Sequence, residues 1–281
     1  MKLNSWPDVP SFFDKVRSAL ELEEGLNSRI LGLCLHALKR PSVSNPYLVT
    51  LEQDGIIGLT ALMLKPGKLI LSGSFAEPEL LQALADDLNQ SSLLVNFLNG
   101  PQASAEYLVP ILTRHSGLQY ELLQRHCFHE LTQLEPIQLP EGLFRQADMA
   151  DLDLIIGWVL DFYKTSLPTE TPPADPRSVI GPSLADGDYF LWETDGQARA
   201  MVAKMRPCTT GITLGWVYAP PEARGQGHAT SVTAHMTQHL LESGWRLCWL
   251  FTDIANPVSN HIYQKLGYRP VSMFDFYGRV P

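Results

Sequence analysis

Cysteine is scarce in this chain. The 281 residues include four cysteines, which lie far apart and form no Cys-x-x-Cys pair: Cys34, Cys127, Cys208 and Cys248. A disulfide framework or a zinc site made of closely spaced cysteines is therefore not expected, and the pattern favours a reducing compartment.

Long hydrophobic runs and basic clusters are missing as well. No uncharged apolar run approaches ~18 residues, so we expect no membrane span. The first residues, MKLNSWPDVPSFFDKV, are interrupted by prolines and acids and do not form a signal peptide. With 21 Lys and Arg against 30 Asp and Glu, the net charge is −9, and the excess is spread over both halves. We therefore expect a cytoplasmic protein that binds no nucleic acid.

Three familiar site motifs are also absent. The chain has no GxxxxGK[ST] string, and Gly225 and Gly227 are followed by Thr230 where a dinucleotide fingerprint has its third glycine. His235 and His239 have the spacing of a zinc pair, but the acidic residue and a third ligand are missing. No metal is predicted.

The chain contains the same order of expected helices and strands twice. In the second half we expect a strand at 144–148, helices at 151–167 and 176–186, a hairpin at 189–205, a strand at 211–219, a helix at 228–243, a strand at 246–253, a helix at 258–266 and a last strand pair to Tyr277. In the first half we expect helices at 11–23 and 26–39, a hairpin at 47–64, a strand at 68–73, a helix at 77–90, a strand at 92–98, a helix at 102–115 and a strand at 118–131. The repetition indicates a duplicated α/β unit with a boundary in the proline-rich residues 135–142.

The segment VYAPPEARGQGHATSV, residues 217–232, places two prolines and two glycines between an expected strand and an expected helix. Gly225 and Gly227 can adopt positive φ, which lets successive N–H groups converge on one point. The start of a helix adds partial positive charge there. Pro220 and Pro221 carry no N–H, so they end the strand and leave its edge open. The turn predicts a pyrophosphate site, with an ordinary glycine turn as the alternative.

Two strings in this half carry a family resemblance. Arg224-Gly225-Gln226-Gly227-His228-Ala229 matches the pattern Q/R-x-x-G-x-G/A, and NPVSNHIYQKLGY (256–268) follows it. Both resemble signatures of the GNAT superfamily of acyl-CoA-dependent N-acetyltransferases. The resemblance covers residues 144–281 and implies an α/β (α+β) fold in which helices flank a mixed, mostly antiparallel, twisted sheet. It also implies acetyl-CoA as co-substrate, a catalytic domain at 143–281 and a degenerate tandem domain at 1–135.

The resemblance further implies where the co-substrate binds. The loop from Arg224 to Thr230 would hold the pyrophosphate, and the main chain of 217–219 would bind the pantetheine arm. Asn256, with Ser259 or Asn260, would cap the next helix and reach the cofactor's amides. The implied cofactor-binding residues are Val217, Tyr218, Ala219, Arg224, Gly225, Gln226, Gly227, His228, Ala229, Thr230, Asn256, Ser259, Asn260 and Tyr263.

The implied reaction is direct transfer of an acetyl group to a primary amine, which is either a small molecule or a peptide. Tyr263 is the candidate general acid that protonates the leaving thiolate. Glu193 and Asp253 are the carboxylates considered as general base. An acyl-CoA-binding sensor or interaction module without turnover is the alternative. A phenol at position 263 favours the enzyme, because binding alone does not require one.

The first half departs from the pattern. The strand KLILSG is followed by Ser74-Phe75-Ala76-Glu77-Pro78, which has no Arg and no paired glycines. The carboxylates of Glu77 and Glu79 would repel a pyrophosphate. We therefore expect the first half to lack a cofactor site and to serve as a scaffold or as a wall of the substrate pocket.

Overall fold

The computed structural model describes residues 1–40, 45–73, 75–167 and 171–280. The chain packs into two compact units. Unit 1 comprises Met1–Phe128, Phe251–Asn256 and Pro270–Pro281, and unit 2 comprises His129–Leu250 and Pro257–Arg269. The end of the sequence therefore belongs to the unit that the first half builds.

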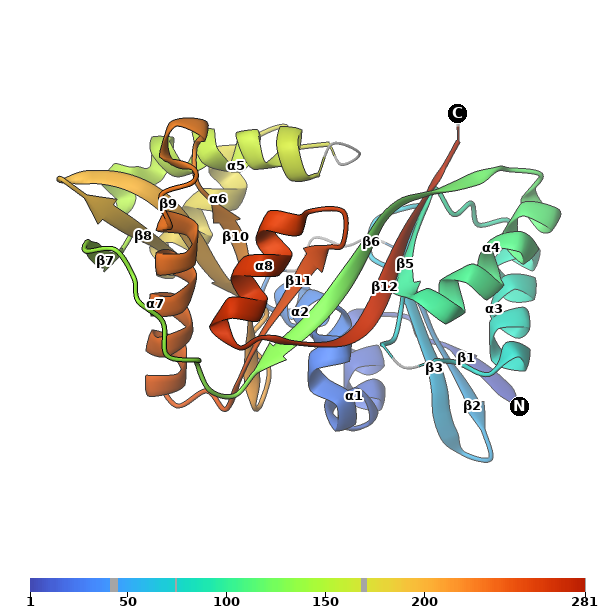
Figure 1. Ribbon diagram of the computed structural model, residues 1–281. Helices are drawn as coiled ribbons and strands as arrows, with labels where there is room; N and C mark the ends of the chain where they lie inside the picture. Colours follow the sequence, from blue (N-terminus) through green and yellow to red (C-terminus); the bar gives the residue numbers. More distant parts are fainter. Residues whose placement is uncertain (41–44, 74, 168–170, 281) are drawn as a thin grey trace. The chain divides into compact units, whose positions relative to one another are not determined.

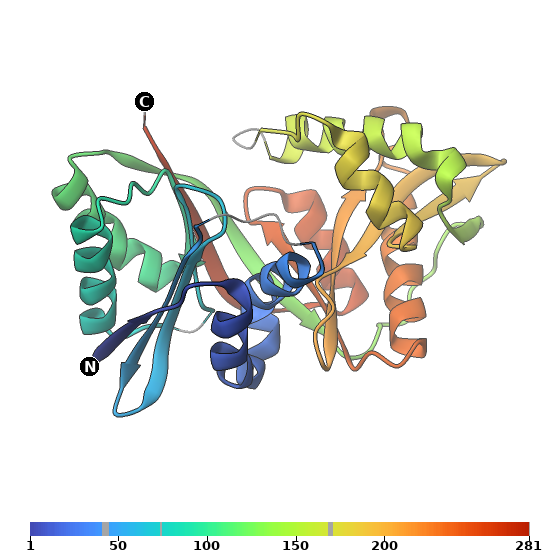
Figure 2. The ribbon, with the colours of Figure 1, turned by 180° about the vertical axis from the view of Figure 1, so that it is seen from behind.

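Unit 1 alternates strands and helices. Its elements are β1 (Lys2–Ser5), α1 (Val9–Leu20), α2 (Glu24–Lys39), β2 (Tyr47–Gln53), β3 (Ile56–Met63), β4 (Lys68–Leu71), α3 (Pro78–Gln90), β5 (Phe97–Pro101), α4 (Gln102–Ser116), most of β6 (Tyr120–Leu131) and all but the first residue of β12 (Arg269–Arg279). Strands β1-β2-β3-β4-β5-β12 are neighbours in this order, and all pairs are antiparallel except β4 with β5. In Figures 1 and 2, α3 and α4 cover one face of these strands and α1 and α2 cover the other.

Unit 2 repeats this arrangement. Its elements are β7 (Leu143–Gln146), α5 (Leu152–Ser166), α6 (Pro176–Ala185), β8 (Tyr189–Thr194), β9 (Gln197–Met205), β10 (Gly211–Tyr218), α7 (His228–Glu242), the first part of β11 (Leu247–Asp253) and α8 (Pro257–Leu266). The strand order is β11-β10-β9-β8-β7, and only β10 with β11 is parallel. The expected mixed, mostly antiparallel sheet flanked by helices is thus confirmed.

Alternation along the strands of unit 2 supplies a core on each face, because successive side chains point to opposite sides. One core lies between the sheet and helices α7 and α8, and the other lies between the sheet and helices α5 and α6. In β8, Phe190 and Trp192 belong to the first core, whereas Tyr189 and Leu191 belong to the second. Helices therefore cover both faces of the sheet of unit 2.

Three details differ from the expectations. Strand β1 was not predicted, because its four residues lack an apolar alternation and are at most half-buried. The strand expected at 92–98 is found at Phe97–Pro101, because Ser92 has a φ of 52° and belongs to the turn that closes α3. The last strand pair is a single strand, β12.

No helix in the described ranges has the length and apolarity that a membrane crossing needs.

Candidate cofactor and active site

The loop between β10 and α7 offers a row of main-chain donors. Gly225 and Gly227 have φ values of 74° and 82°, and Gly227 caps α7 without a side-chain hydrogen bond. Within the described ranges, none of the N–H groups from Gly225 to Thr230 has an acceptor in the protein. A Cβ at position 225 would meet no atom within 4 Å. This cradle of free donors at a helix start fits a pyrophosphate such as that of acetyl-CoA.

Two side chains of the loop fold back onto its own main chain. The Arg224 Nε donates to the carbonyl oxygen of Ala219 at 3.0 Å, and its guanidinium lies 5.8 Å from the centre of the Tyr218 ring. The Gln226 Nε2 donates to the carbonyl oxygen of Glu222 at 3.1 Å. These contacts tie the end of β10 to the loop and hold the shape of the turn.

The end of β10 is irregular. Its pairing with β9 shifts by one residue between Gly215 and Tyr218, and within this bulge Trp216 has a φ of 53°. The parallel pairing with β11 covers Gly211 to Thr213 in the described chain, although β10 continues for several residues. The last part of β10 thus has main-chain groups open on its β11 side, where an extended ligand arm can add like a strand.

Tyr263 lies on α8 and is 7% exposed. Its ring meets the Tyr268 ring edge-on at 5.9 Å, and the Tyr268 hydroxyl shares a 2.7 Å hydrogen bond with the Thr237 Oγ1 of α7. Burial raises the pKa of Tyr263, so the phenol stays protonated at neutral pH. No described residue hydrogen-bonds to its hydroxyl. Val217 and Ala219 pack against the core cluster that contains Tyr263.

The two candidate bases lie in different surroundings. The Glu193 carboxylate accepts from the Arg145 Nε at 2.7 Å, and β9 separates its strand from β10. Arg145 also binds Asp151 through both terminal nitrogens, at 2.7 and 2.9 Å, which lowers the pKa of Asp151. Asp253 belongs to unit 1, where it accepts hydrogen bonds from the Gln124 Nε2 at 3.2 Å and from the Ala255 N–H at 2.9 Å.

The remaining predicted residues divide between the units. Ser259 and Asn260 lie in the first turn of α8 in unit 2, whereas Asn256 precedes that helix and belongs to unit 1. Ala229 and Thr230 are half-buried in the first turn of α7.

His228 begins α7 and is 6% exposed. Neither of its ring nitrogens has a partner among the described residues. Burial, together with the positive charge of Arg199, lowers the pKa of His228. The imidazole therefore stays neutral beside the loop at neutral pH.

The equivalent turn of unit 1 differs from the loop before α7 in the residues that the structure describes. Ser74 lies outside the described residues. The N–H of Ala76 donates to the Ser104 Oγ at 3.3 Å, and helix α3 begins with Pro78, which has no N–H. Unlike the loop before α7, this turn has acidic residues beside it, Glu77 and Glu79.

The bulge and its strained residue, Trp216, were not predicted, because residues 211–219 were expected to form a regular strand. A bulge leaves no firm mark in a sequence, because Gly215 before it is equally compatible with a regular strand. His, Cys, Asp and Glu side chains of the described residues form no group of three or more that could hold a metal ion.

Comparisons with known proteins agree with this geometry. Residues 194–274 match the family model described as FR47-like protein. A mycothiol acetyltransferase from Cellulomonas flavigena is 30% identical over 103 residues, and the match spans 33% of this chain and 30% of that protein. The chain therefore covers less than a third of this curated relative.

Two solved structures resemble the whole chain. An acetyltransferase of the GNAT family from Colwellia psychrerythraea has a TM-score of 0.62 at 13% identity, with 100% of both chains covered. A GCN5-related N-acetyltransferase from Kribbella flavida has a TM-score of 0.58 at 18% identity, with 91% of this chain and 96% of that chain covered. These similarities agree with the resemblance expected from the motifs, and they show that the chain has the fold of the GNAT proteins.

Proposed function

We propose that the protein transfers an acetyl group from acetyl-CoA to a primary amine. The observation that carries this proposal is the row of free N–H groups from Gly225 to Thr230, at the start of α7 and next to the open end of β10. The name of the Cellulomonas flavigena relative, an acetyltransferase, supports acetyl as the group transferred. Its substrate is not carried over, because the match spans 30% of that protein.

The loop residues would hold the pyrophosphate through their main chain, while Arg224 and Gln226 keep the turn in shape. The main chain of Val217, Tyr218 and Ala219 would hydrogen-bond to the pantetheine arm along the open edge of β10. Asn256, Ser259 and Asn260, around the start of α8, remain candidates for contacts with the amides of the same arm.

Acetyl-CoA supplies a thioester carbon for the amine to attack. One C–N bond forms, one C–S bond breaks, the amine loses a proton and the departing thiolate gains one. Main-chain N–H groups near Tyr218 and Ala219 would stabilise negative charge on the carbonyl oxygen. The protonated phenol of Tyr263 would donate to the sulfur.

The general base remains a proposal with two candidates. Glu193 is held by Arg145, and Asp253 accepts two hydrogen bonds in unit 1. If one of them removes the proton of the amine, Glu193→Gln or Asp253→Asn should abolish the acidic limb of the pH–rate profile. An unaltered profile in both variants would exclude them and leave the proton to water.

The experiment that tests the function combines calorimetric titration of CoA with detection of thiol release. The protein is incubated with acetyl-CoA and a panel of primary amines. Release of thiol that depends on the amine supports the enzyme. Tight binding of CoA without release by any amine would support the acyl-CoA-binding sensor instead, and absence of CoA binding would overturn both functions.

A further inference from the structure

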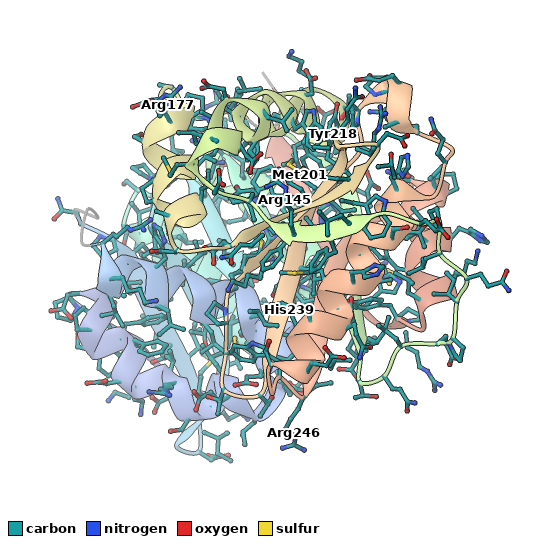
Figure 3. The ribbon with its side chains drawn as sticks, turned by 90° about the vertical axis from the view of Figure 1, so that its left-hand side faces the viewer. Arg145, Arg177, Met201, Tyr218, His239 and Arg246 are labelled. Atoms are coloured by element: carbon teal, nitrogen blue, oxygen red, sulfur yellow. The ribbon has the colours of Figure 1, made fainter. Side chains whose placement is uncertain are left out.

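The side chains at the end of β10 lie on two faces of the sheet and pack against different helices of unit 2. Val217 packs toward α7 and α8, in the cluster that contains Tyr263. Trp216 and Tyr218 pack on the opposite face, with α5 and α6. Figure 3 shows Tyr218 and its neighbour Met201 beneath α5. If the loop and Tyr263 serve the co-substrate, the face beneath α5 is the one left for the second substrate.

Helix α5 lines that face with aromatic rings. The Trp158 ring lies 6.0 Å from the Tyr218 ring. One turn further along α5, Phe162 and Tyr163 contact Trp216, with ring centroids at 5.2 and 5.6 Å. Trp216, Phe162 and Tyr163 are all half-buried, so part of this aromatic surface is open to a ligand.

The backbone of Trp216 supports a role beyond packing. A bulky residue at positive φ costs about 1–3 kcal/mol, and such strain gathers at binding sites. Within the bulge, Trp216 lies on the side of α5, where its half-buried indole contacts the rings of Phe162 and Tyr163. A regular strand would have avoided this strain. We infer that the position that the bulge gives to the indole offsets its cost.

A negative charge lies on the same side. Asp161 is three residues after Trp158 and therefore shares its helix face. Burial first, and then the charge of Asp161, raise the pKa of Tyr218. The Asp161 carboxylate is 46% exposed, and among the described residues its ion-pair partner is Lys164 at 3.0 Å, a side chain that is 74% exposed. Such surface pairs contribute little and yield readily to a better cation.

We propose that the acceptor bound beside α5 and the bulge of β10 is a primary amine with an aromatic or flat apolar group. The Asp161 carboxylate binds the ammonium group. The indole of Trp216, which contacts Phe162 and Tyr163, stacks on the apolar group. This inference rests on the proposed acetyl transfer. It names the face from which the amine enters and the chemistry that selects it.

The test compares phenethylamine with ethanolamine as acceptors for the full-length protein. The wild type should show a kcat/KM for phenethylamine at least about tenfold higher than for ethanolamine. Asp161→Asn should raise the KM for both amines about tenfold or more and leave the KM for acetyl-CoA within about twofold. Trp216→Ala should remove the preference for phenethylamine. The affinity of phenethylamine for the complex with CoA, measured by calorimetric titration, should fall in parallel in both variants.

Asp153→Asn is the matched control, because Asp153 lies on the same helix, is 82% exposed and pairs with Arg177. It should leave every constant near the wild-type value. Equal use of both amines, or an Asp161→Asn variant with the constants of the wild type, would overturn the acceptor surface while acetyl transfer stands. A wild type that fails to bind CoA would overturn the proposed function itself.

Discussion

The N–H of Gly73 donates a 2.7 Å hydrogen bond to the Oδ1 of Asn27 in unit 1. Gly73 follows β4, at the place where the edge of β10 is open in unit 2. The Asn27 amide nitrogen also donates to the carbonyl oxygens of Leu20 and Glu23, each at 3.1 Å. A Cβ on Gly73 would come within 2.4 Å of the Leu26 carbonyl oxygen. Helix α2 thus occupies the end of β4, at the place where a ligand arm would have to add to unit 1.

Replacing Asn27 with Leu should destabilise unit 1. The variant keeps the volume but leaves the buried N–H of Gly73 without an acceptor, which costs about 1–3 kcal/mol. Denaturation monitored by circular dichroism should show this loss, whereas the dissociation constant of CoA should not change. Asn89→Ala, on the exposed end of α3, is the control. Unaltered unfolding of Asn27→Leu would show that the bond contributes no stability.

Gly227→Val should weaken CoA binding a hundredfold or more. A β-branched residue resists the φ of 82° at this position, and its Cβ would already lie 3.6 Å from Pro140, so the turn would have to shift and its N–H groups would no longer converge. Losing two or three charge-assisted hydrogen bonds at roughly 1.5–3 kcal/mol each accounts for that factor. Gln226→Ala should bind nearly as the wild type does, because it removes only the side-chain bond to Glu222.

Calorimetric titration of CoA distinguishes these outcomes. Glu77→Gln, in the equivalent turn of unit 1, is the control and should leave CoA affinity unchanged. Equal affinities of Gly227→Val and the wild type would contradict the phosphate loop and with it the cofactor site.

Tyr263→Phe should lower kcat by tenfold or more while the dissociation constant of CoA stays near normal. The hydroxyl makes no hydrogen bond among the described residues, so its loss should cost little stability. Tyr268→Phe is a matched control, because this buried phenol is bonded to Thr237 at 2.7 Å. It should lower the melting temperature and leave kcat mostly intact. A Tyr263→Phe variant with unchanged turnover would remove Tyr263 from the mechanism.

Local chemistry explains which parts of the structure were predictable. The glycines at 225 and 227 fix a turn by themselves, and the periodicity of residues 151–167 and 228–243 fixes two helices, so these features could be read from the sequence. The family motifs then supplied the fold. All of these signals depend on neighbours in the chain.

The features that were not predicted depend on contacts between residues far apart in the sequence. The indole of Trp216, within the bulge, contacts Phe162 and Tyr163 of α5, which lie far earlier in the sequence. The closure of the strand end in unit 1 depends on Asn27, which lies 46 residues before Gly73. The ion pair of Glu193 with Arg145 joins residues 48 apart and holds a carboxylate that looked available for catalysis.

His126 gives unit 1 a second property that can be measured. The residue is 9% exposed, its ring packs 4.6 Å from the Phe276 ring, and its Nδ1 has no partner among the described residues. Burial first, and then the positive charge of Arg29, lower the pKa of His126 from 6.5 to about 4, while the carboxylate of Asp253 acts in the opposite direction. The folded protein therefore keeps this imidazole neutral in mildly acidic solution.

The stability of the protein should consequently fall as the pH drops from about 6.5 to about 4. In this window the unfolded chain binds a proton at His126 and the folded chain does not, so acid favours unfolding. Above pH 6.5 both states are neutral, and below pH 4 both are protonated, so the contribution is constant there. The full loss is of the order of 3 kcal/mol. His126→Gln, which cannot titrate, should show a shallower decrease of the melting temperature between pH 7 and pH 4.5. Parallel decreases for the variant and the wild type would mean that the buried imidazole already takes up its proton in the folded state.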